Sequence, residues 1–516
     1  MFLFWSIAAL VVATVVFRVL CATRQAKLDL TYVQFDGDNS DARYKEDSLS
    51  LLTRGYKEYI SKGCAFAIRD PTEVKQPMAV LPVKYLDEVK WLPEQKLSFW
   101  THIDKLSALS QIGGPRLNEE VSIAARHGLN VALAHLIEPL ETACRAAYAK
   151  ELPPCQGWTS IHPYPLIVKI FASMSALIMV GPKLGAPDSD WQALSTAYLQ
   201  VAMTGPREVR DHYPSWLYRL APYTNKAIRE MWSLRARGAA LLAPLLEERR
   251  AASEEEAVYV GKGGKVREGK RKYEDAVQWL YDAHQTTGRA LTPDQLVQEV
   301  LVIMVASLHS TSAVGLSVLF DMLDHPEAVD EIREEIVRVR KANLVWTRPA
   351  LAELKVLDSF MRESARIHGL TQYTAVQRVA MVPWTFKDGL TIPAGTTLVF
   401  PGYHHGTDPS VHPDPEKFDF KRHLRKREEK EENAHKFHFA SAGSEDIISW
   451  GAGRHACAGR FFAQEALKLM FIHLLTHYDF KYAEGTEEMP RFVARHMFLS
   501  PNPMLPILIR ERKVEG

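Results

Sequence analysis

The sequence reads Trp450-Gly451-Ala452-Gly453-Arg454-His455-Ala456-Cys457-Ala458-Gly459 near its C-terminal end, and this stretch decides how the rest of the chain is interpreted. Glycine tolerates positive φ and lets a backbone approach a bulky flat ligand, because it has no Cβ atom. From Ala458 onward, apolar residues recur at three- and four-residue spacing, which predicts a helix that begins just after Cys457. Amide donors and a helix dipole stabilise a thiolate there. The stretch therefore predicts a cysteine presented to a metal.

The same stretch resembles the haem-binding loop of the cytochrome P-450 monooxygenases, whose pattern is Phe-x-x-Gly-x-Arg-x-Cys-x-Gly. Gly453, Cys457 and Gly459 fall on the positions of that pattern. Trp450 replaces the phenylalanine, and a larger ring beside the sulfur alters hydrogen bonding and solvent access, which tune haem potential. The resemblance implies haem b, with its iron axially bound by Cys457. The other interpretation is an inert, buried cysteine in a glycine-rich loop.

The resemblance also implies which side chains neutralise the haem propionates. His455 replaces the arginine of the pattern, and Arg454 precedes it by one residue. Arg378, at the start of a β-rich stretch, stands where the family often supplies a propionate-binding arginine. Arg126 and His127 are further candidates, or else belong to a solvated helix face. The implied cofactor contacts are Cys457, Arg454, His455, Arg378, Trp450, Gly451, Gly453 and Gly459.

The composition is that of an ordinary globular protein, with 516 residues, 47% apolar residues and a net charge of +1. This balance carries no electrostatic signature of nucleic-acid binding, so we expect no nucleic-acid partner. The five cysteines are odd in number and scattered, which indicates reduced thiols facing the cytosol. The resemblance implies a mainly α fold with small β-sheets, the cytochrome P-450 fold.

Residues 2–22 are almost entirely apolar and have close to the length of a membrane-spanning helix. Arg18, Arg24 and Lys27 lie at the C-terminal flank, which the positive-inside rule places in the cytoplasm. We predict a single-pass anchor in the endoplasmic reticulum membrane with a cytoplasmic catalytic domain. A signal peptide and a helix lying on the membrane are the other interpretations. The predicted parts are an anchor at 1–23, a polar linker at 24–44 and a catalytic domain at 45–516.

The strongest helical pattern opens at Thr292, with Pro293 at the first helical position and Gln295 placed to close a capping box. The pattern continues to about Leu323 and is apolar on nearly every face, so we expect this helix to be buried in the middle of the protein. One polar patch interrupts it, formed by Ser307, His309, Ser310, Thr311 and Ser312.

That patch resembles the oxygen-activating stretch of the family's central helix, with His309 in place of an acid and Ser310 in place of the first threonine. A similar pattern is typical of the fungal ent-kaurene-oxidase-like group. The resemblance implies that His309, Ser310 and Thr311 handle dioxygen and protons, since a neutral histidine relays protons near pH 7. The other interpretation is a hydrogen-bonded core histidine with serines that bond back to helix carbonyls.

A second helical pattern, Leu351–His368, carries Glu363 and Arg366 three residues apart and therefore on one face. In its position along the chain this pair resembles the family's Glu-x-x-Arg motif, a structural clamp with a third partner downstream. Arg422 fits the fungal version of that partner, while Lys417 occupies the position where other members carry the arginine. Both stay candidates.

Two other stretches give local predictions. Lys387-Asp388-Gly389 predicts a turn, after which Leu390–Pro393 and Thr396–Phe400 are expected to pair as strands. Glu254–Lys272 is charged and glycine-bearing, which predicts a surface loop.

The resemblance implies an NADPH- and O₂-dependent monooxygenase that oxidises a small hydrophobic molecule, such as a terpenoid, alkaloid or polyketide of fungal secondary metabolism. The sequence has no nicotinamide- or flavin-binding fingerprint. We therefore expect a separate NADPH-cytochrome reductase as electron donor, with cytochrome b5 as a further candidate. The rival interpretations are an O₂-independent haem-thiolate isomerase or dehydratase, and a non-catalytic membrane haem protein.

Overall fold

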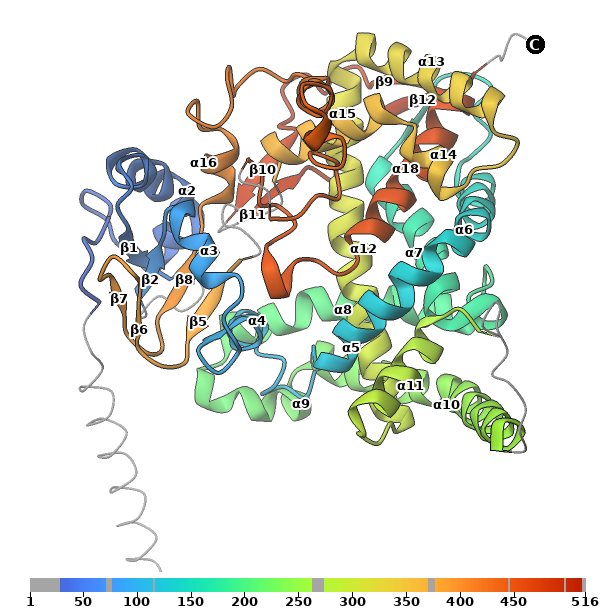
Figure 1. Cartoon of the computed structure of the whole chain (residues 1–516), viewed down its shortest axis with the longest axis horizontal. Coiled ribbons are helices and arrows are strands. Elements are labelled where there is room, and N and C mark those ends of the chain that lie inside the picture. The colour runs from blue at the N-terminus through green and yellow to red at the C-terminus, as the bar shows by residue number, and fades with distance from the viewer. Residues whose placement is uncertain are drawn as a thin grey trace, which may run out of the picture.

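The computed structural model describes residues 28–70, 77–114, 117–261, 273–369, 376–443, 446–495 and 498–512. Within these ranges the chain is mainly helical, with short strands in small sheets, as predicted. Figure 1 shows the largest sheet and α2 (Asp41–Glu58) gathered at one side, and the long helices packed together at the other. The predicted anchor at residues 1–23 lies outside the described residues.

Most of the described chain lies in α-helices. After α2 these are α3 (Leu86–Val89), α4 (Phe99–Ser107), α5 (Glu119–Ile123), α6 (Asn130–Glu151), α7 (Pro163–Leu184), α8 (Asp190–His212), α9 (Ala221–Thr224), α10 (Lys226–Gly261), α11 (Ala276–Thr287), α12 (Pro293–Asp324), α13 (Pro326–Ala342), α14 (Arg348–Ala352), α15 (Lys355–Ile367), α16 (Gly402–Gly406), α17 (Arg422–Glu428) and α18 (Arg460–His477). Shorter helical segments are η1 (Ile60–Lys62), η2 (Val83–Tyr85), η3 (Ala124–Leu129), η4 (Ser215–Leu220), η5 (Glu431–Asn433) and η6 (Gly453–His455).

The largest sheet has the strand order β1-β2-β8-β5-β3, in which β2 and β8 run parallel and the other neighbours antiparallel. Its strands are β1 (Phe66–Arg69), β2 (Pro77–Val80), β3 (Leu97–Ser98), β5 (Arg378–Ala380) and β8 (Thr397–Val399). The smaller sheets join β4 (Thr159–Ile161), β12 (Ile507–Glu511) and β9 (Tyr478–Tyr482); β10 (Phe492–Arg495) and β11 (Phe498–Pro501); and β6 (Trp384–Thr385) and β7 (Thr391–Ile392). The largest sheet matters for function because it positions Arg378.

The central helix α12 begins as predicted, with Thr292 as its N-cap: the Thr292 hydroxyl accepts a hydrogen bond from the Gln295 N–H at 3.2 Å. It runs through the middle of the helical part, in contact with α7, α10, α15 and α18 (Figure 1). Both α7 and α12 are apolar and long enough to cross a membrane, but 67% and 61% of their most apolar windows are buried inside the protein. They are therefore core helices.

The stretch at 28–44 differs from the expected polar linker. Val33, Phe35 and Tyr44 are buried, Tyr32 pairs with Ala67 of β1, and α2 already begins at Asp41. A few apolar side chains among polar neighbours are enough to attach this stretch to the sheet.

Two local predictions are wrong. The segment Leu390–Pro393 does not pair with Thr396–Phe400: β7 pairs with β6 across the predicted turn, and β8 pairs with β2 and β5. The pairing of β8 with β2 and β5 is favoured because it places β8 inside the sheet, with a hydrogen-bonded neighbour on each edge. Residues 254–261 continue α10 instead of forming a loop, since Glu and Ala favour a helix. Residues 262–272 lie outside the described ranges.

Candidate functional site

Cys457 lies in a tight loop that ends at α18. Its N–H donates to the Trp450 carbonyl at 2.8 Å. Gly451 (φ 71°) and Gly453 (φ 61°) adopt left-handed backbone conformations, and a Cβ on Gly453 would clash with the Lys90 carbonyl. Gly459 differs, because a Cβ there would have no atom of the described residues within 4 Å, its two chain neighbours apart. Gly451 and Gly453 are thus required by the backbone conformation of the loop, whereas Gly459 leaves open space beside it.

The electrostatic surroundings of Cys457 act in both directions. Part of the side chain is accessible to solvent. Protein atoms surround the rest, and the resulting loss of hydration raises the pKa of the thiol. The N–H groups of Gly459 and Arg460 and the positive charge of Arg460 lower it. The donors at the start of α18 therefore favour the thiolate, and a bound metal cation would favour it further.

Arg378, the first residue of β5, is a buried cation. Its Nη1 donates to the Gln377 carbonyl at 2.8 Å, whereas its Nη2 has no hydrogen-bond partner among the described residues. Burial lowers the pKa of Arg378 to about 10, although nearby Glu94 opposes this. The Phe99 ring lies 5.3 Å from the guanidinium carbon and 5.1 Å from the His455 ring. Arg378 and His455 therefore both pack against the Phe99 ring.

His455 forms an ion pair with Glu94, with His455 Nε2 2.6 Å from Glu94 Oε1. Burial would raise the pKa of Glu94, but hydrogen bonds from His455, Ser98 and the Trp100 N–H lower it to about 2. Arg454 is placed differently: its side chain is exposed, its N–H donates to the Lys90 carbonyl at 3.0 Å, and its carbonyl accepts from Arg126. His455 thus lies with Arg378, whereas Arg454 contacts its neighbours through its backbone.

The polar patch of α12 keeps a helical backbone. The Ser310 hydroxyl donates to the Ala306 carbonyl at 2.8 Å, and the Ser307 hydroxyl donates to the Met304 carbonyl at 3.0 Å. These bonds use the hydroxyl protons and leave the oxygen lone pairs as acceptors. Desolvation lowers the pKa of His309, so the ring is neutral at pH 7. Thr311 is buried.

A cavity of about 420 Å³ lies between α4, α8 and α12. Apolar side chains of α12 form one wall, while α4 and the residues after it contribute several polar groups. Its lining includes Trp100, Asp104, Ser107, Tyr198, Val302, Val305 and Ala306. Because the Ala306 carbonyl is the partner of Ser310, the cavity and the polar patch meet on one turn of α12.

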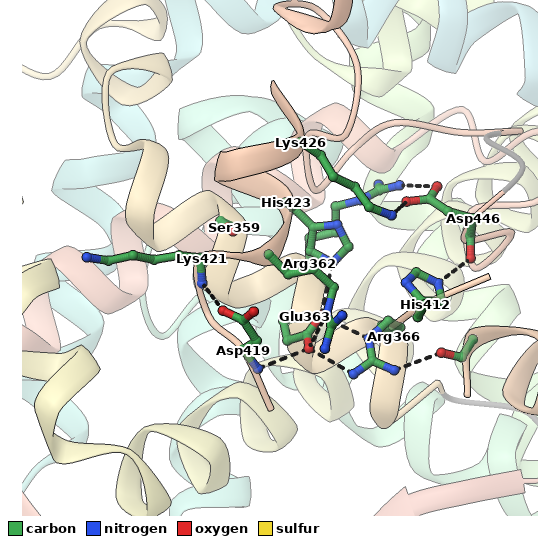
Figure 2. A network of polar contacts seen from close by, with 12 residues as sticks. Ser359, Arg362, Glu363, Arg366, His412, Asp419, Lys421, His423, Lys426 and Asp446 are labelled. Carbon is green, nitrogen blue, oxygen red and sulfur yellow. Dashed lines mark hydrogen bonds and ion pairs between the residues drawn. The ribbon is translucent and has the colours of Figure 1, made fainter. Parts of the chain in front are cut away.

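A buried ion-pair network surrounds Glu363 on α15 (Figure 2). Glu363 accepts from Arg366 Nε at 2.9 Å and Nη2 at 2.8 Å, and from Arg422 Nε at 3.1 Å. His423 Nε2 lies 3.1 Å from the second carboxylate oxygen. Burial opposes ionisation, but these partners hold the pKa of Glu363 well below its usual range. Arg422 is thus the third partner, and Lys417 contributes its carbonyl, which accepts from Arg422 at 3.1 Å.

Comparison with known proteins identifies this arrangement, since residues 138–508 match the family model Cytochrome P-450. The chain belongs to the cytochrome P-450 family. Among its relatives, Cytochrome P-450 monooxygenase CYP2 of Pyricularia oryzae is 37% identical over 460 residues, which cover 89% of this chain and 92% of the relative. Pyrichalasin C-7 hydroxylase of Pyricularia grisea is 34% identical over a region that covers 90% of this chain and 89% of the relative. Cytochrome P-450 monooxygenase cheE of Chaetomium globosum is 32% identical, covering 92% and 90%.

Solved structures agree on the fold. A retinoic-acid-bound cyanobacterial cytochrome P-450, CYP120A1, superposes with a TM-score of 0.65 at 15% identity, covering 94% of this chain and 99% of that one. The haem domain of cytochrome P-450DA gives a TM-score of 0.66 at 14% identity, covering 94% and 98%. The family match and the monooxygenase relatives make this cytochrome P-450 a haem-thiolate monooxygenase, whose cofactor is haem with a cysteine thiolate on the iron.

The described residues fit that cofactor. A haem carries two anionic propionates. The buried Nη2 of Arg378, which has no hydrogen-bond partner in the part of the chain that the structure describes, is a donor suited to such a group. Cys457 stands before a helix N-terminus, and Gly459 leaves room beside the loop. Sequence reasoning missed Glu94, which reaches His455 from a distant segment, and His423, which follows Arg422 and contacts Glu363. A charged residue in an unremarkable stretch gives no local signal of such a contact.

Proposed function

We propose that Cys457 is the axial thiolate ligand of this cytochrome P-450, and that the enzyme inserts one oxygen atom of O₂ into a small hydrophobic molecule. When bound, the haem supplies the activation of O₂. The geometry of the loop carries the proposal: Cys457 is held by the Trp450 carbonyl and faces open space in front of the donors of α18.

Arg378 and His455 hold the propionate side of the haem in this proposal. Arg378 offers a buried guanidinium whose Nη2 has no partner within the described ranges, and His455 lies against the same Phe99 ring. Glu94 keeps the His455 ring oriented through its contact with Nε2. Arg454 adds positive charge at the exposed surface of the loop.

His309, Ser310 and Thr311 deliver protons and position O₂ in this proposal. The Ser310 oxygen keeps its lone pairs available, because its proton is donated to the Ala306 carbonyl. A water bound there would receive protons through the neutral His309 ring. Ser310 bonds to the carbonyl of Ala306, which lines the cavity, and His309 precedes Ser310 on α12.

The cavity defines the substrate class that we propose. Its walls of Val302, Val305 and Ala306 suit an apolar skeleton, and its volume of about 420 Å³ lies in the range of small-molecule sites. The polar groups opposite, including Asp104 and Ser107, suit a few oxygen or nitrogen functions. One relative is named a pyrichalasin C-7 hydroxylase, which supports a terpenoid, alkaloid or polyketide of fungal secondary metabolism.

Electrons come from NADPH through a separate reductase in this proposal, with cytochrome b5 as a further donor. Arg126, Arg454 and Arg425 are exposed cations that would attract an acidic partner. The apolar stretch at 2–22 supports an anchor in the endoplasmic reticulum membrane, with the catalytic domain in the cytoplasm.

Metabolite mass spectrometry tests the proposal. The source strain is compared with one that carries Cys457→Ser at the native locus, and with a control strain that carries Cys64→Ser at an exposed, unrelated thiol. We expect Cys457→Ser alone to accumulate an intermediate that lacks one oxygen atom. An intermediate with the same number of oxygen atoms would favour the isomerase, and one with an additional oxygen atom would favour the dehydratase. An unchanged profile would contradict a role in metabolite synthesis.

A further inference from the structure

A continuous chain of hydrogen bonds leads from a buried carboxylate on α15 to the cysteine loop. Asp358 Oδ2 accepts from the Phe439 N–H at 3.0 Å. The Phe439 carbonyl accepts from the Trp450 indole N–H at 2.5 Å, and the Trp450 carbonyl accepts from the Cys457 N–H at 2.8 Å. These three contacts connect α15 with the backbone of Cys457 through two aromatic residues.

The first member of this chain is held firmly. Asp358 is 1% exposed and contacts three basic side chains: Lys468 at 3.1 Å, Arg427 at 3.2 Å and His438 at 3.7 Å. Lys468 comes from α18, the helix that follows Cys457, and Arg427 comes from α17. Asp358 therefore fixes the Phe439 segment relative to both flanks of the cysteine loop, and a buried carboxylate with such partners has little freedom to move.

The second member is the residue that departs from the family pattern. Phenylalanine has no polar hydrogen, whereas the indole of Trp450 donates its N–H to the Phe439 carbonyl. The two rings also meet edge to face, with centroids 5.3 Å apart. An indole N–H that is committed to Phe439 is not available to the sulfur of Cys457. The tryptophan thus adds a tether to the loop without adding a hydrogen bond to the ligand.

We propose that Asp358 and Trp450 are positioning residues for Cys457, and that the Trp450 indole fixes the ligand loop to Phe439 instead of donating to the thiolate. This inference rests on the proposed role of Cys457 as the iron ligand. It assigns a use to the tryptophan: the tether keeps the thiolate at the iron, while the electron density of the sulfur is left unchanged.

Trp450→Phe tests the inference in the full-length haem protein. The carbon monoxide complex of the reduced protein reports the ligand, because thiolate-bound and thiol-bound haem absorb at different Soret wavelengths. We expect the variant to convert from the thiolate to the thiol form about five- to tenfold faster, because the loop loses the stabilisation of one hydrogen bond. We expect its reduction potential to be unchanged, because the sulfur keeps its own hydrogen bonds. Trp158→Phe, at a partly exposed tryptophan far along the chain, is the matched control.

Asp358→Asn tests the distant end of the chain. Glu335→Gln is its control. Glu335 is also a buried carboxylate, but the N–H groups that it binds among the described residues belong to Lys355, Val356 and Leu357 at the start of α15 and not to the Phe439 segment. We expect both variants to lower the unfolding temperature, and Asp358→Asn alone to speed the thiolate-to-thiol conversion. In the double variant with Trp450→Phe, the two effects should be less than additive.

Two results would overturn the inference. One is an unchanged conversion rate in Trp450→Phe, which would remain decisive if Asp358→Asn did not fold. The other is a more negative reduction potential in Trp450→Phe, since that would show that the indole donates to the sulfur. Failure of the ligand assignment itself is recognised separately, because Cys457→Ser would then keep the Soret band of the wild type.

Discussion

Arg422 Nε lies 3.1 Å from Glu363 Oε1, the same carboxylate oxygen that accepts from Arg366 Nη2 at 2.8 Å. One oxygen therefore holds an arginine from its own helix and an arginine 59 residues further along the chain. Arg422 also donates to the carbonyls of Pro413, Asp414 and Lys417. This contact fastens the segment before the cysteine loop to α15.

Removal of Arg422 should destabilise the whole domain. Arg422→Ala leaves Glu363 with a buried, partly uncompensated charge, so we expect the free energy of unfolding to fall by about 3 kcal/mol or more. Arg422→Lys should recover little of the lost stability, because an ammonium group lacks the planar guanidinium that donates to several carbonyls at once. Denaturant titration measures the effect. Arg425→Ala, at the exposed neighbour that pairs with Asp419, should cost less than about 1 kcal/mol. Equal costs for the two arginines would contradict the network.

Arg378 should determine how tightly haem is held. Arg378→Leu removes the buried guanidinium, so we expect haem to transfer to an excess of apomyoglobin about tenfold faster or more, since a charge-assisted hydrogen bond is lost. Arg378→Lys should lie between this variant and the wild type. Arg340→Leu, at an exposed arginine of α13, should transfer haem at the wild-type rate. If Arg378→Leu also did so, the propionate assignment would be wrong.

Ser310 should matter for oxygen chemistry and not for folding. In Ser310→Ala we expect the fraction of NADPH electrons that appears in product to fall about tenfold or more. Ser317→Ala is the control, because its hydroxyl also bonds back to a carbonyl of α12, that of Ala313 at 3.1 Å. Product and NADPH consumption are measured in the same assay. Full turnover in Ser310→Ala would favour chemistry that uses no O₂.

His404 should make the domain sensitive to acid. Burial lowers the pKa of His404 from 6.5 to about 4, so the unfolded chain binds more protons than the folded one between these values. Its contribution to the free energy of unfolding is therefore complete above about pH 6.5 and is lost as the pH falls towards 4, by up to about 3 kcal/mol. Unfolding measured across this range should show a shallower pH slope in His404→Gln. The exposed His435→Gln should leave the slope unchanged, and an equal change in both would refute the assignment.

The sequence predicted features that depend on neighbouring residues. The cap of α12 at Thr292 and the positive φ of Gly451 and Gly453 follow from local backbone rules, so they were found without a structure. The pairing of Glu363 with Arg366 follows from helix periodicity for the same reason.

The features that were missed join distant segments. Glu94 meets His455 across more than 300 residues, and Asp358 reaches Phe439 across 81 residues. The strand β8 pairs with β2 from the other end of the chain. None of these contacts has a periodic or spaced signature, because each depends on how the helices pack against one another.

The ferrous carbon monoxide spectrum of the purified full-length protein tests the role of Cys457 most directly. The account predicts that the wild type and the exposed-thiol variant Cys64→Ser both show the Soret band of thiolate-bound haem, and that Cys457→Ser loses it while retaining its helical content. A thiolate-type Soret band that persists in Cys457→Ser would contradict the assignment of the ligand, and with it the proposed site.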